Sequence, residues 1–384
     1  MLYWERVTKM ESMAHLLKEL PKDYEDGCIK QGALKRRRGV PSPPGLAVLA
    51  MPHLQNGCPL MEMSEAAGIA KLGKMSGVAF MDRFEQCGKW FWGLNEKMAA
   101  ESIINYEKPN WLAGKTVVAA DASDVSGKGR PGRVHRLHYA LDIFKMSRVE
   151  HKTTTNKTGE SLCNFNPQPG QLTIAGRAYS PINGINHCNG AGAEYILRVR
   201  RNSFTLKDGN GEKIDLLALL PGPGAGEALG LAAYAANMGG GRAKAGVCAK
   251  RKTPEAAAQT QKRLKRKESK KQRPAGEETK TFNGYIVLAA NLEEPATAEE
   301  VLEACRLRWQ AGICFKRLKS ILDFGELPER RPGSVIAWLN GKTMVALLTG
   351  IAVAKAVFPP QGGHGPERLA RNQTRQTVYC HQFL

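Results

Sequence analysis

An aspartate at the end of an apolar run is the first residue whose type and position could do chemistry. The stretch "KTVVAAD" is typical of a short β-strand, and Asp121 is its last residue. A carboxylate at a strand end can hold Mg²⁺ through its oxygens. Two such ions can activate a nucleophile and stabilise a leaving oxygen in phosphoryl transfer, which requires further carboxylates from a neighbouring strand and a helix. By itself, Asp121 fits a cap or turn residue equally well.

A basic stripe on a predicted helix is the second candidate. In "CRLRWQAGICFKRLKS", residues Cys305, Arg308, Gly312 and Lys319 are offset by 3, 7 and 14 positions. At about 100° per residue, they fall within a stripe of roughly 60°. Arg308 and Lys319 suit phosphate groups, although a solvated helix face has the same composition. A glycine inside a helix costs about 1 kcal/mol relative to alanine, so Gly312 raises the question of which residue once stood there.

The charge of the chain points to a polyanionic partner. The 384 residues contain 56 Lys and Arg against 36 Asp and Glu, a formal net charge of +20. Between positions 242 and 273 there are thirteen basic residues, Lys265 and Arg266 among them, and two glutamates. This run predicts a helix with basic faces that could bind phosphates. The alternatives are a solvated helix on an inserted subdomain and a basic surface without a specific partner.

Residues 1–110 are predicted to be helical. Their apolar residues recur at helical spacing, with a break near Gly73 and Ser76. Short helices around such a turn fit a helix-turn-helix and equally fit a plain helical cap. The preceding run "LKRRRG" contains Arg36, Arg37 and Arg38. Beside a helical DNA reader, these arginines could touch phosphates.

A mixed α/β sheet is predicted from Lys115 onward. Apolar or alternating runs typical of strands occupy 115–121, 135–145, 147–155, 170–176 and 193–201, with short helical or turn segments at 159–165 and 180–188. The stretches 221–230 and 237–246 are rich in glycine and predict loops. A further strand is expected at 283–292. The helix that follows should begin at Thr297, because Glu300 completes a capping box.

Other protein classes are disfavoured. None of the nine cysteines lies in a CxxC pair, which argues against a zinc ribbon or a redox motif and suits a reducing cytosol. The apolar stretch "MVALLTGIAVAKAVF" is interrupted by Lys355 and predicts a buried helix too short to span a membrane. No signal-peptide core is recognised, so a cytoplasmic, nucleoid-associated protein without a membrane partner is expected.

The combination of motifs resembles a known family. The helix spacing, with "RLRWQ", "FKRLKS" and "LDFGELP", is similar to the Tyr-Arg-Glu-Lys signature of bacterial insertion-sequence transposases of the insertion-sequence-four group, which carry an Asp-Asp-Glu triad. The stretches "DASDVSG", "HRLHYALDI", "TGESL", "AGRAY" and "GALKRRRGV" also resemble this family, and the resemblance runs from about residue 28 to about residue 355. It implies a ribonuclease-H-like core with a β-rich insertion before the last long helix. It also implies two Mg²⁺ ions, double-stranded DNA at the element ends, and a homodimer in a synaptic complex.

The resemblance also assigns residues. Asp121 matches the first acid and metal ligand, whereas the second acid falls on Gly176 and the glutamate falls on Gly312. The tyrosine of the signature falls on Cys305. Together with the basic runs, the matches give one set of expected DNA-binding residues: Arg308, Lys319, Lys316, Arg177, Arg36, Arg37, Arg38, Lys265 and Arg266.

The expected consequence is a transposase with an impaired metal site. Glycine has no oxygen to coordinate a metal, so one acid of three should bind Mg²⁺ poorly. Glu160 and Asp142 occupy ordinary positions of the family, and Asp323 lies three turns beyond Gly312, so none is expected to substitute. The alternatives are a non-catalytic DNA-binding protein or regulator derived from a transposase, and a decayed copy with compromised folding.

Five segments are predicted from these patterns. They are a helical DNA-binding region at 1–110, the first part of the core at 111–204, a basic insertion at 205–283, the second part of the core with the signature helix at 284–355, and a loose tail at 356–384.

Overall fold

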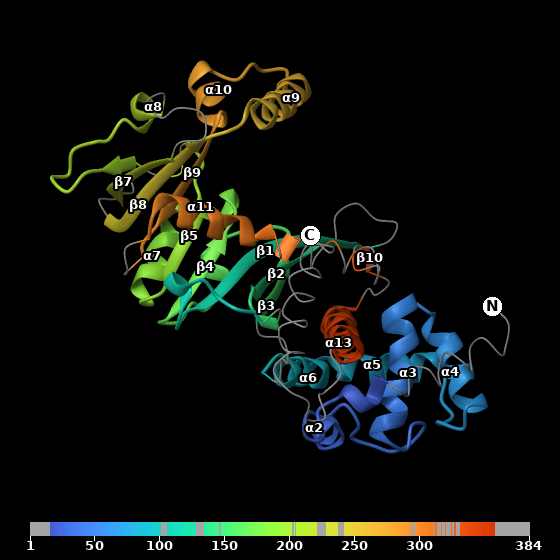
Figure 1. Ribbon diagram of the computed structural model, residues 1–384. Coiled ribbons are helices and arrows are strands. Elements are labelled where there is room, and N and C mark those ends of the chain that lie inside the picture. The colour runs from blue at the N-terminus through green and yellow to red at the C-terminus, as the bar shows by residue number, and fades with distance from the viewer. Residues whose placement is uncertain are drawn as a thin grey trace.

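The computed structural model is a mixed α/β protein with a helical region beside a large sheet (Figure 1). It describes residues 16–100, 106–127, 134–145, 147–201, 203, 205–220, 228–236, 242–292, 296–309, 311–312, 316, 319, 324, 326–327 and 331–357. The predicted tail therefore lies outside the described residues, apart from 356 and 357, which end the last helix.

The helical region is built from segments at both ends of the chain. It contains η1 (Leu17–Glu19), α2 (Tyr24–Lys30), α3 (Pro43–Asn56), α4 (Leu60–Ile69), α5 (Gly77–Gln86), α6 (Gly88–Ala100) and α13 (Pro332–Val357). The side chains of Ser42 and Ser76 accept hydrogen bonds from backbone N–H groups and cap α3 and α5. In Figure 1, α13 lies among α3, α5 and α6, and one continuous apolar core joins them. The predicted helical character of this region is confirmed.

Helix α13 contains the apolar stretch that was interpreted as a buried helix. Residues Pro332–Ala352 are long and apolar enough to cross a membrane by length and composition, so the expectation that the segment is too short was wrong. However, 61% of its apolar part is buried inside the protein, and Trp338 is among the buried residues. Packing in the core accounts for its apolar character, as predicted.

The helical region is fastened to the sheet by a buried arginine on β3. Arg148 donates to Glu96 Oε1 of α6 at 2.6 Å, and its second terminal nitrogen lies 3.1 Å from Nδ1 of His151. The other ring nitrogen of His151 lies 2.9 Å from Oδ1 of Asn340 in α13. Because Arg148 must donate, His151 accepts at Nδ1 and donates from Nε2. This network joins three elements that are far apart in sequence.

The sheet has ten strands in the order β3-β2-β1-β4-β5-β9-β8-β7-β6, with β10 paired to the end of β1. Its first half contains β1 (Thr116–Gly127), β2 (Val134–Asp142), β3 (Ser147–Thr155), β4 (Gln171–Ala175) and β5 (Glu194–Arg198). Strands β1 to β3 form an antiparallel meander, while β4 and β5 run parallel to β1. This is the expected ribonuclease-H-like core, and the predicted strands are present in it. Asp121 was expected to end the first of them, but β1 continues to Gly127, so that part of the prediction was wrong.

Alternation along β1 determines what each of its residues faces. Val118 and Ala120 belong to a core shared with α7 (Ile182–Gly190), whereas Val117 and Ala119 belong to one shared with α11 (Ala298–Leu307). Because successive side chains point to opposite faces of a strand, Asp121 lies on the α11 face. The 3-10 turns η2 (Asn110–Leu112), η3 (Leu162–Asn164) and η4 (Arg177–Tyr179) complete this half.

The basic insertion extends the same sheet. It contains β6 (Thr205–Lys207), α8 (Leu216–Leu219), β7 (Ala228–Ala236), β8 (Arg242–Arg251), α9 (Pro254–Lys271) and α10 (Glu277–Asn283), and leads into β9 (Tyr285–Ala290). The expectation of loops at 221–230 and 237–246 was wrong in part, because β7 begins at 228 and β8 at 242. Small alanine- and glycine-rich segments pair along nine residues here, so tertiary pairing overrides their weak strand propensity.

The signature segment begins as predicted and is interrupted at one residue. Thr297 and Glu300 form the capping box at the start of α11, and Arg308 is its C-cap, still with helical dihedral angles. Gly312, Lys316 and Lys319 have helical backbone beyond it. The short strand β10 (Glu326–Leu327) follows and leads to α13.

Candidate functional site

Two of the three predicted acid positions meet in the centre of the sheet. Strands β1 and β4 are parallel neighbours in which Ala120 lies opposite Ala175. Asp121 and Gly176, the next residue of each chain segment, are therefore neighbours at the same level of the sheet. Asp121 itself is part-buried on the α11 face.

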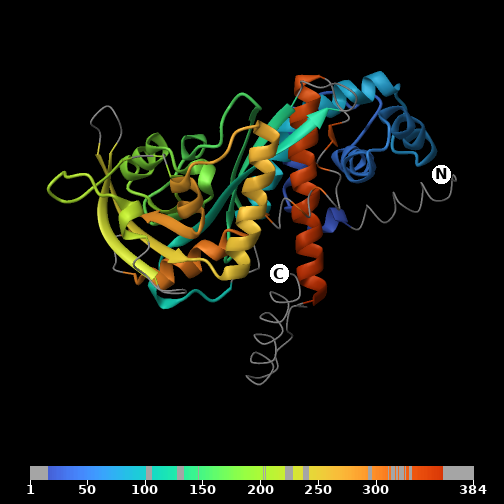
Figure 2. The same ribbon diagram turned by 90° about the horizontal axis from the view of Figure 1, so that it is seen from above.

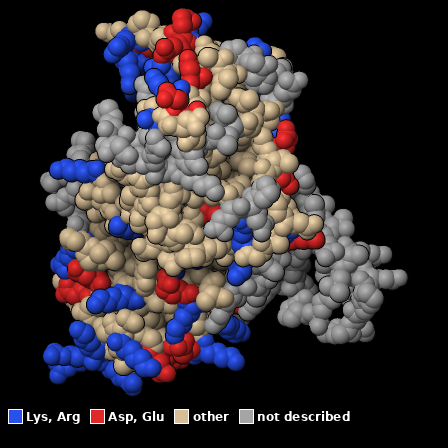
Figure 3. All heavy atoms as spheres, turned by 90° about the vertical axis from the view of Figure 1, so that its left-hand side faces the viewer, with Lys and Arg blue, Asp and Glu red and all other residues tan. Residues whose placement is uncertain are grey.

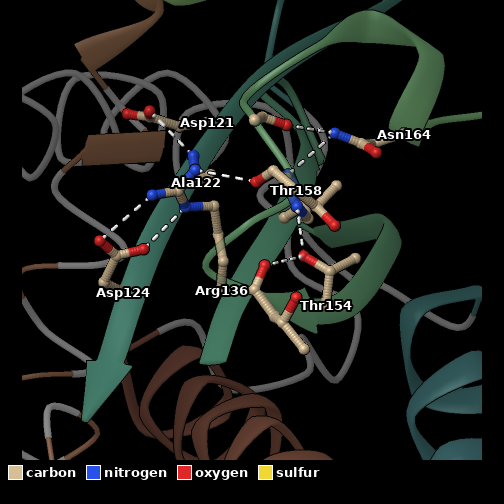
Figure 4. A network of polar contacts seen from close by, with 10 residues as sticks. Asp121, Ala122, Asp124, Arg136, Thr154, Thr158 and Asn164 are labelled. Atoms are coloured by element: carbon tan, nitrogen blue, oxygen red, sulfur yellow. Dashed lines mark hydrogen bonds and ion pairs between the residues drawn. The ribbon is translucent and has the colours of Figure 1, made fainter. Parts of the chain in front are cut away.

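Arg308 lies over Asp121. Its Nη1 atom is 3.5 Å from Oδ2 of Asp121, and both side chains are about three-quarters buried, with 25% and 24% exposure. The backbone N–H of Ala122 donates to the other carboxylate oxygen at 3.0 Å (Figure 4). Burial raises the pKa of Asp121, while the Ala122 N–H and the Arg308 charge act in the opposite direction.

The two glycines leave room for side chains. A Cβ atom built on Gly176 would have Arg308 Nη1 as its nearest neighbour at 3.8 Å, and one built on Gly312 would meet no atom of the described residues within 4 Å. Gly176 has φ −78° and ψ −179°, an extended conformation that any residue adopts. Neither local space nor the backbone at Gly176 therefore requires glycine.

Glu160 is an additional acid close to Asp121. Burial raises the pKa of Glu160, and the negative charge of Asp121 raises it further. The sequence placed Glu160 after the third strand without indicating this proximity. Asp142 has a structural role in a buried turn. Its side chain accepts hydrogen bonds from the backbone N–H groups of Phe144 and Lys145. Asp323 lies outside the described residues.

Asp124 forms a separate pair beside the site. Arg136 Nε donates to Asp124 Oδ1 at 2.7 Å and Arg136 Nη2 to Oδ2 at 3.3 Å, while Arg136 Nη1 donates to the backbone oxygen of Thr158 (Figure 4). The hydrogen bond from Arg136 lowers the pKa of Asp124, and the charge of Lys319 lowers it too. The predicted basic stripe thus approaches this carboxylate.

The residues that the structure describes do not form a two-metal site. Within the described ranges, no group of three or more His, Cys, Asp or Glu side chains is arranged to hold a metal ion. The one retained acid of the predicted triad, Asp121, has a guanidinium as its neighbour. What the site can do with these residues is hold anions beside Arg308.

The predicted basic residues lie in separate places. Arg36, Arg37 and Arg38 are exposed on the loop between α2 and α3. That loop touches the α4–α5 turn, where a Cβ on Gly73 would lie 1.7 Å from the backbone oxygen of Gly39, so only glycine fits. The arginine run therefore lies beside the helix pair it was predicted to accompany.

Lys265 and Arg266 are on α9, at the opposite end of the molecule from α3 to α5 (Figure 1). Thr253 caps this helix, and none of its described residues is buried. In Figure 3, Lys and Arg side chains gather at the level of α9 and α10, with acidic side chains beside them. Lys316 and Lys319 are also exposed, whereas Arg177 is part-buried next to Gly176.

Two further cations lie at strand ends near Arg177. Arg198 is the last residue of β5 and was not singled out by the sequence, whereas Lys252 immediately follows β8 and was one member of the basic run at 242–273. Burial lowers the pKa of Arg177 to about 10, and the charges of Arg198 and Arg200 lower it further. For Arg198, the available signal was its position at the end of a predicted strand.

One aromatic interpretation was wrong. On a regular helical wheel, Trp309 lies about 100° from the stripe of Cys305, Gly312 and Lys319, which predicts a core position. In the structure, its side chain is 65% exposed. Tyr179, in contrast, is buried in the core shared with α7.

The sheet and the arginine-bearing helix define the chain as a protein with a ribonuclease-H-like core. No family model matches the sequence. The chain is similar to the putative transposase InsL for insertion sequence element IS186A of Escherichia coli (strain K12), with 27% identity over 357 residues that cover 91% of this chain and 95% of the relative. It is also 26% identical over 358 residues, with the same coverage, to the transposase for insertion sequence element IS421 of Escherichia coli. These similarities support an insertion-sequence transposase and extend over nearly the whole chain.

Proposed function

We propose that this chain is a DNA transposase by descent that binds the ends of an insertion element and is impaired in Mg²⁺-dependent strand cleavage. The observation that carries the proposal is the position of Gly176 beside Asp121, with its missing Cβ directed at Arg308. An aspartate there would place a second carboxylate next to the first. Similarity to insertion-sequence transposases over 91% of the chain supports the same conclusion.

The chemistry of the donor set supports the impairment. A Mg²⁺ ion would supply charge stabilisation and an activated nucleophile, which requires several carboxylate oxygens around the ion. Asp121 offers one carboxylate, and Arg308 already compensates part of its charge. This chain's own residues would instead orient a phosphate group, because Arg308 can donate to phosphate oxygens from the same position.

The test is cleavage of labelled element-end DNA with Mg²⁺ by the wild type and by the Gly176→Asp, Gly312→Glu double variant. The flanking genomic DNA supplies the end sequence. Both substitutions have space, so the variant is expected to fold like the wild type and to cut, while the wild type does not. Cleavage by the wild type would show that the acids lie elsewhere on the sheet.

A matched control separates charge from carboxylate chemistry. The Gly176→Asn, Gly312→Gln variant adds side chains of nearly the same size without negative charge, and it is expected to remain inactive. If this variant cuts as well as the acidic one, restored metal ligation is not the cause of the activity.

A second candidate function is DNA binding without cleavage, as in a regulator of active copies. It is favoured by the retained cations around a site that has lost its acids, because phosphate contacts do not depend on the carboxylates. Removing carboxylates from a DNA-facing surface also removes repulsion. Binding of element ends by the wild type that equals or exceeds the binding by the double variant would support this role.

A further inference from the structure

The direction of the strands brings several cations to one edge of the sheet. Strands β1, β4 and β5 are parallel, and β8 runs the same way because both β5 and β8 are antiparallel to β9. Their carboxyl-terminal ends therefore point to a common edge. Asp121 lies on this side of β1, Arg177 follows β4, Arg198 ends β5, and Lys252 follows β8.

These side chains are partly removed from water without a matching set of acids. The Nε atoms of Arg177 and Arg198 are buried and have no hydrogen-bond partner among the described residues. Lys252 Nζ donates to Thr260 Oγ1 of α9 at 3.0 Å and to the backbone oxygen of Asn283 at 2.5 Å, both of which are neutral acceptors. The nearby acid Glu278 is already paired with Arg201.

The cations influence one another along the edge. Burial lowers the pKa of Lys252 to about 8, and the charges of Arg198, Arg177 and Arg263 lower it as well. The charge of Arg308 likewise lowers the pKa of Arg198. Arg308, Arg198, Arg177, Lys252 and Arg263 thus form an electrostatically connected series from Asp121 to α9, which we name the cation seam.

Like charges held together in part-buried positions destabilise a protein unless an anion joins them. A phosphodiester strand supplies one negative charge at each of a regular series of phosphates, so it can compensate such a series along its length. A single small anion would reach only part of it. The seam therefore fits a polyanion that extends from Asp121 towards α9.

We propose that the cation seam binds the phosphate backbone of the DNA end and guides it from the Asp121 site to helix α9. This inference rests on the proposed function and deepens it, because it specifies the path of the DNA over this face. Lys252 lies where the path reaches α9, and Arg263 is the residue of α9 that continues it.

The proposal distinguishes two sides of α9. Arg263 and Lys265 are two residues apart, which places them about 200° apart around the helix. Both are exposed and both carry one positive charge. Thr260, which accepts a hydrogen bond from Lys252, lies three residues before Arg263 and on the same side of α9, so the seam includes Arg263 and leaves out Lys265. Lys265 belongs to the DNA-binding residues expected from the basic run, and the seam replaces that expectation, so Lys265 serves as the matched control on the same helix.

The experiment compares full-length wild type, Arg263→Gln and Lys265→Gln by fluorescence anisotropy with a labelled element-end duplex over a range of NaCl concentrations. Loss of one phosphate contact is expected to reduce the slope of log affinity against log salt by about 0.9 in Arg263→Gln, with roughly tenfold weaker binding at 0.1 M salt. The slope for Lys265→Gln should equal that of the wild type. Equal effects of the two substitutions, or no effect of either, would overturn the seam.

Lys252→Gln is the second variant. Glutamine keeps hydrogen-bonding capacity towards Thr260 and Asn283 but removes the charge. A phosphate-binding lysine predicts weaker DNA binding together with an unchanged or higher melting temperature, since repulsion is relieved. Wild-type affinity in this variant overturns the assignment of Lys252. If the wild type binds no DNA even at low salt, the proposed function itself fails, which is a different result from a failed seam.

Discussion

The candidate site has an acidic half and a basic half, and the two differ in how many charged side chains they contain. On the acid half, Asp121 is retained, and the positions that the family resemblance matches to its partner acids are Gly176 and Gly312. On the basic half, Arg308 lies over the site, and Arg177, Arg198 and Lys252 lie along the adjoining edge. The sheet that would position both halves is intact.

The comparison teaches that cleavage and binding depend on different parts of one fold. Metal ligation needs several carboxylates converging on one point, so the loss of a single side chain is severe. Phosphate binding is distributed over many cations, and each contributes a fraction of the affinity. A site of this kind can lose metal-dependent cleavage and still bind a polyanion.

The largest expected effect concerns Asp121 in the acid-restored protein. In the Gly176→Asp, Gly312→Glu background, Asp121→Asn should reduce Mg²⁺-dependent cleavage by at least about 100-fold, the scale seen when a group that stabilises the transition state is removed. Single-turnover cleavage of labelled end DNA measures this.

Asp124→Asn in the same background is the control, because Asp124 lies three residues along the same strand and pairs with Arg136. It should cost much less than Asp121→Asn. Equal losses from the two substitutions would mean that any carboxylate on β1 matters and that the acid half is wrongly placed.

A second prediction compares two part-buried or buried arginines by stability. Arg148→Met should lower the free energy of unfolding by about 2–3 kcal/mol, because Arg148 makes charged hydrogen bonds that fasten β3 to the helical region. Arg177→Met should change it by no more than about 0.5 kcal/mol or should raise it, since the neighbouring charges that lower its pKa are those of Arg198 and Arg200. Urea denaturation followed by circular dichroism measures both.

The stability comparison can fail in one clear way. If Arg177→Met destabilises as much as Arg148→Met, the seam arginines have a structural function and the basic half is not retained for a ligand.

A third prediction follows from the lowered pKa of Lys252. The pKa of about 8 in the folded protein lies below the ordinary lysine value of 10.5, so the unfolded chain binds more protons between these values. The free energy of unfolding should therefore increase as the pH rises from about 8 to about 10.5. Below pH 8, Lys252 is charged in the folded protein and destabilises it by the full amount. The difference in melting temperature between wild type and Lys252→Met, measured across this interval, should shrink as the wild type loses the charge.

The smallest expected effect is the stability cost of the remaining acid. Because burial raises the pKa of Asp121, its negative charge costs stability once the pH lies above both the unfolded and the folded value. Asp121→Asn in the otherwise wild-type chain should thus leave the melting temperature at pH 7 unchanged or slightly higher, within about 0.5 kcal/mol. A clear loss of stability would indicate that the Asp121–Arg308 pair holds the helix on the sheet.

Local patterns predicted the elements of the fold with few exceptions. The capping box at Thr297, the alternating strands of the meander and the apolar helix around Trp338 each carry their signal within a few residues. Strands β7 and β8 were missed in part because their alanines and glycines favour no conformation strongly, and their pairing with each other decides the outcome.

The candidate site was predictable only where a motif had fixed spacing. That spacing linked Arg308 and Lys319 to one helix and singled out Gly312. It gave no indication that Trp309 would be exposed. It also did not reveal Glu160 near Asp121, which depends on a loop returning to the sheet.

The sequence by itself determined the residue inventory of this protein: an excess of 20 positive charges, one acid at the end of an apolar run, and glycines at the two positions that the family resemblance matches to acids. Tertiary structure decided which of these residues meet. Asp121, Gly176 and Arg308 are separated by 55 and 132 positions in the sequence, yet strand register and helix packing bring them together. The cation seam is equally a product of strand direction, because only the shared orientation of β4, β5 and β8 gathers their terminal cations at one edge.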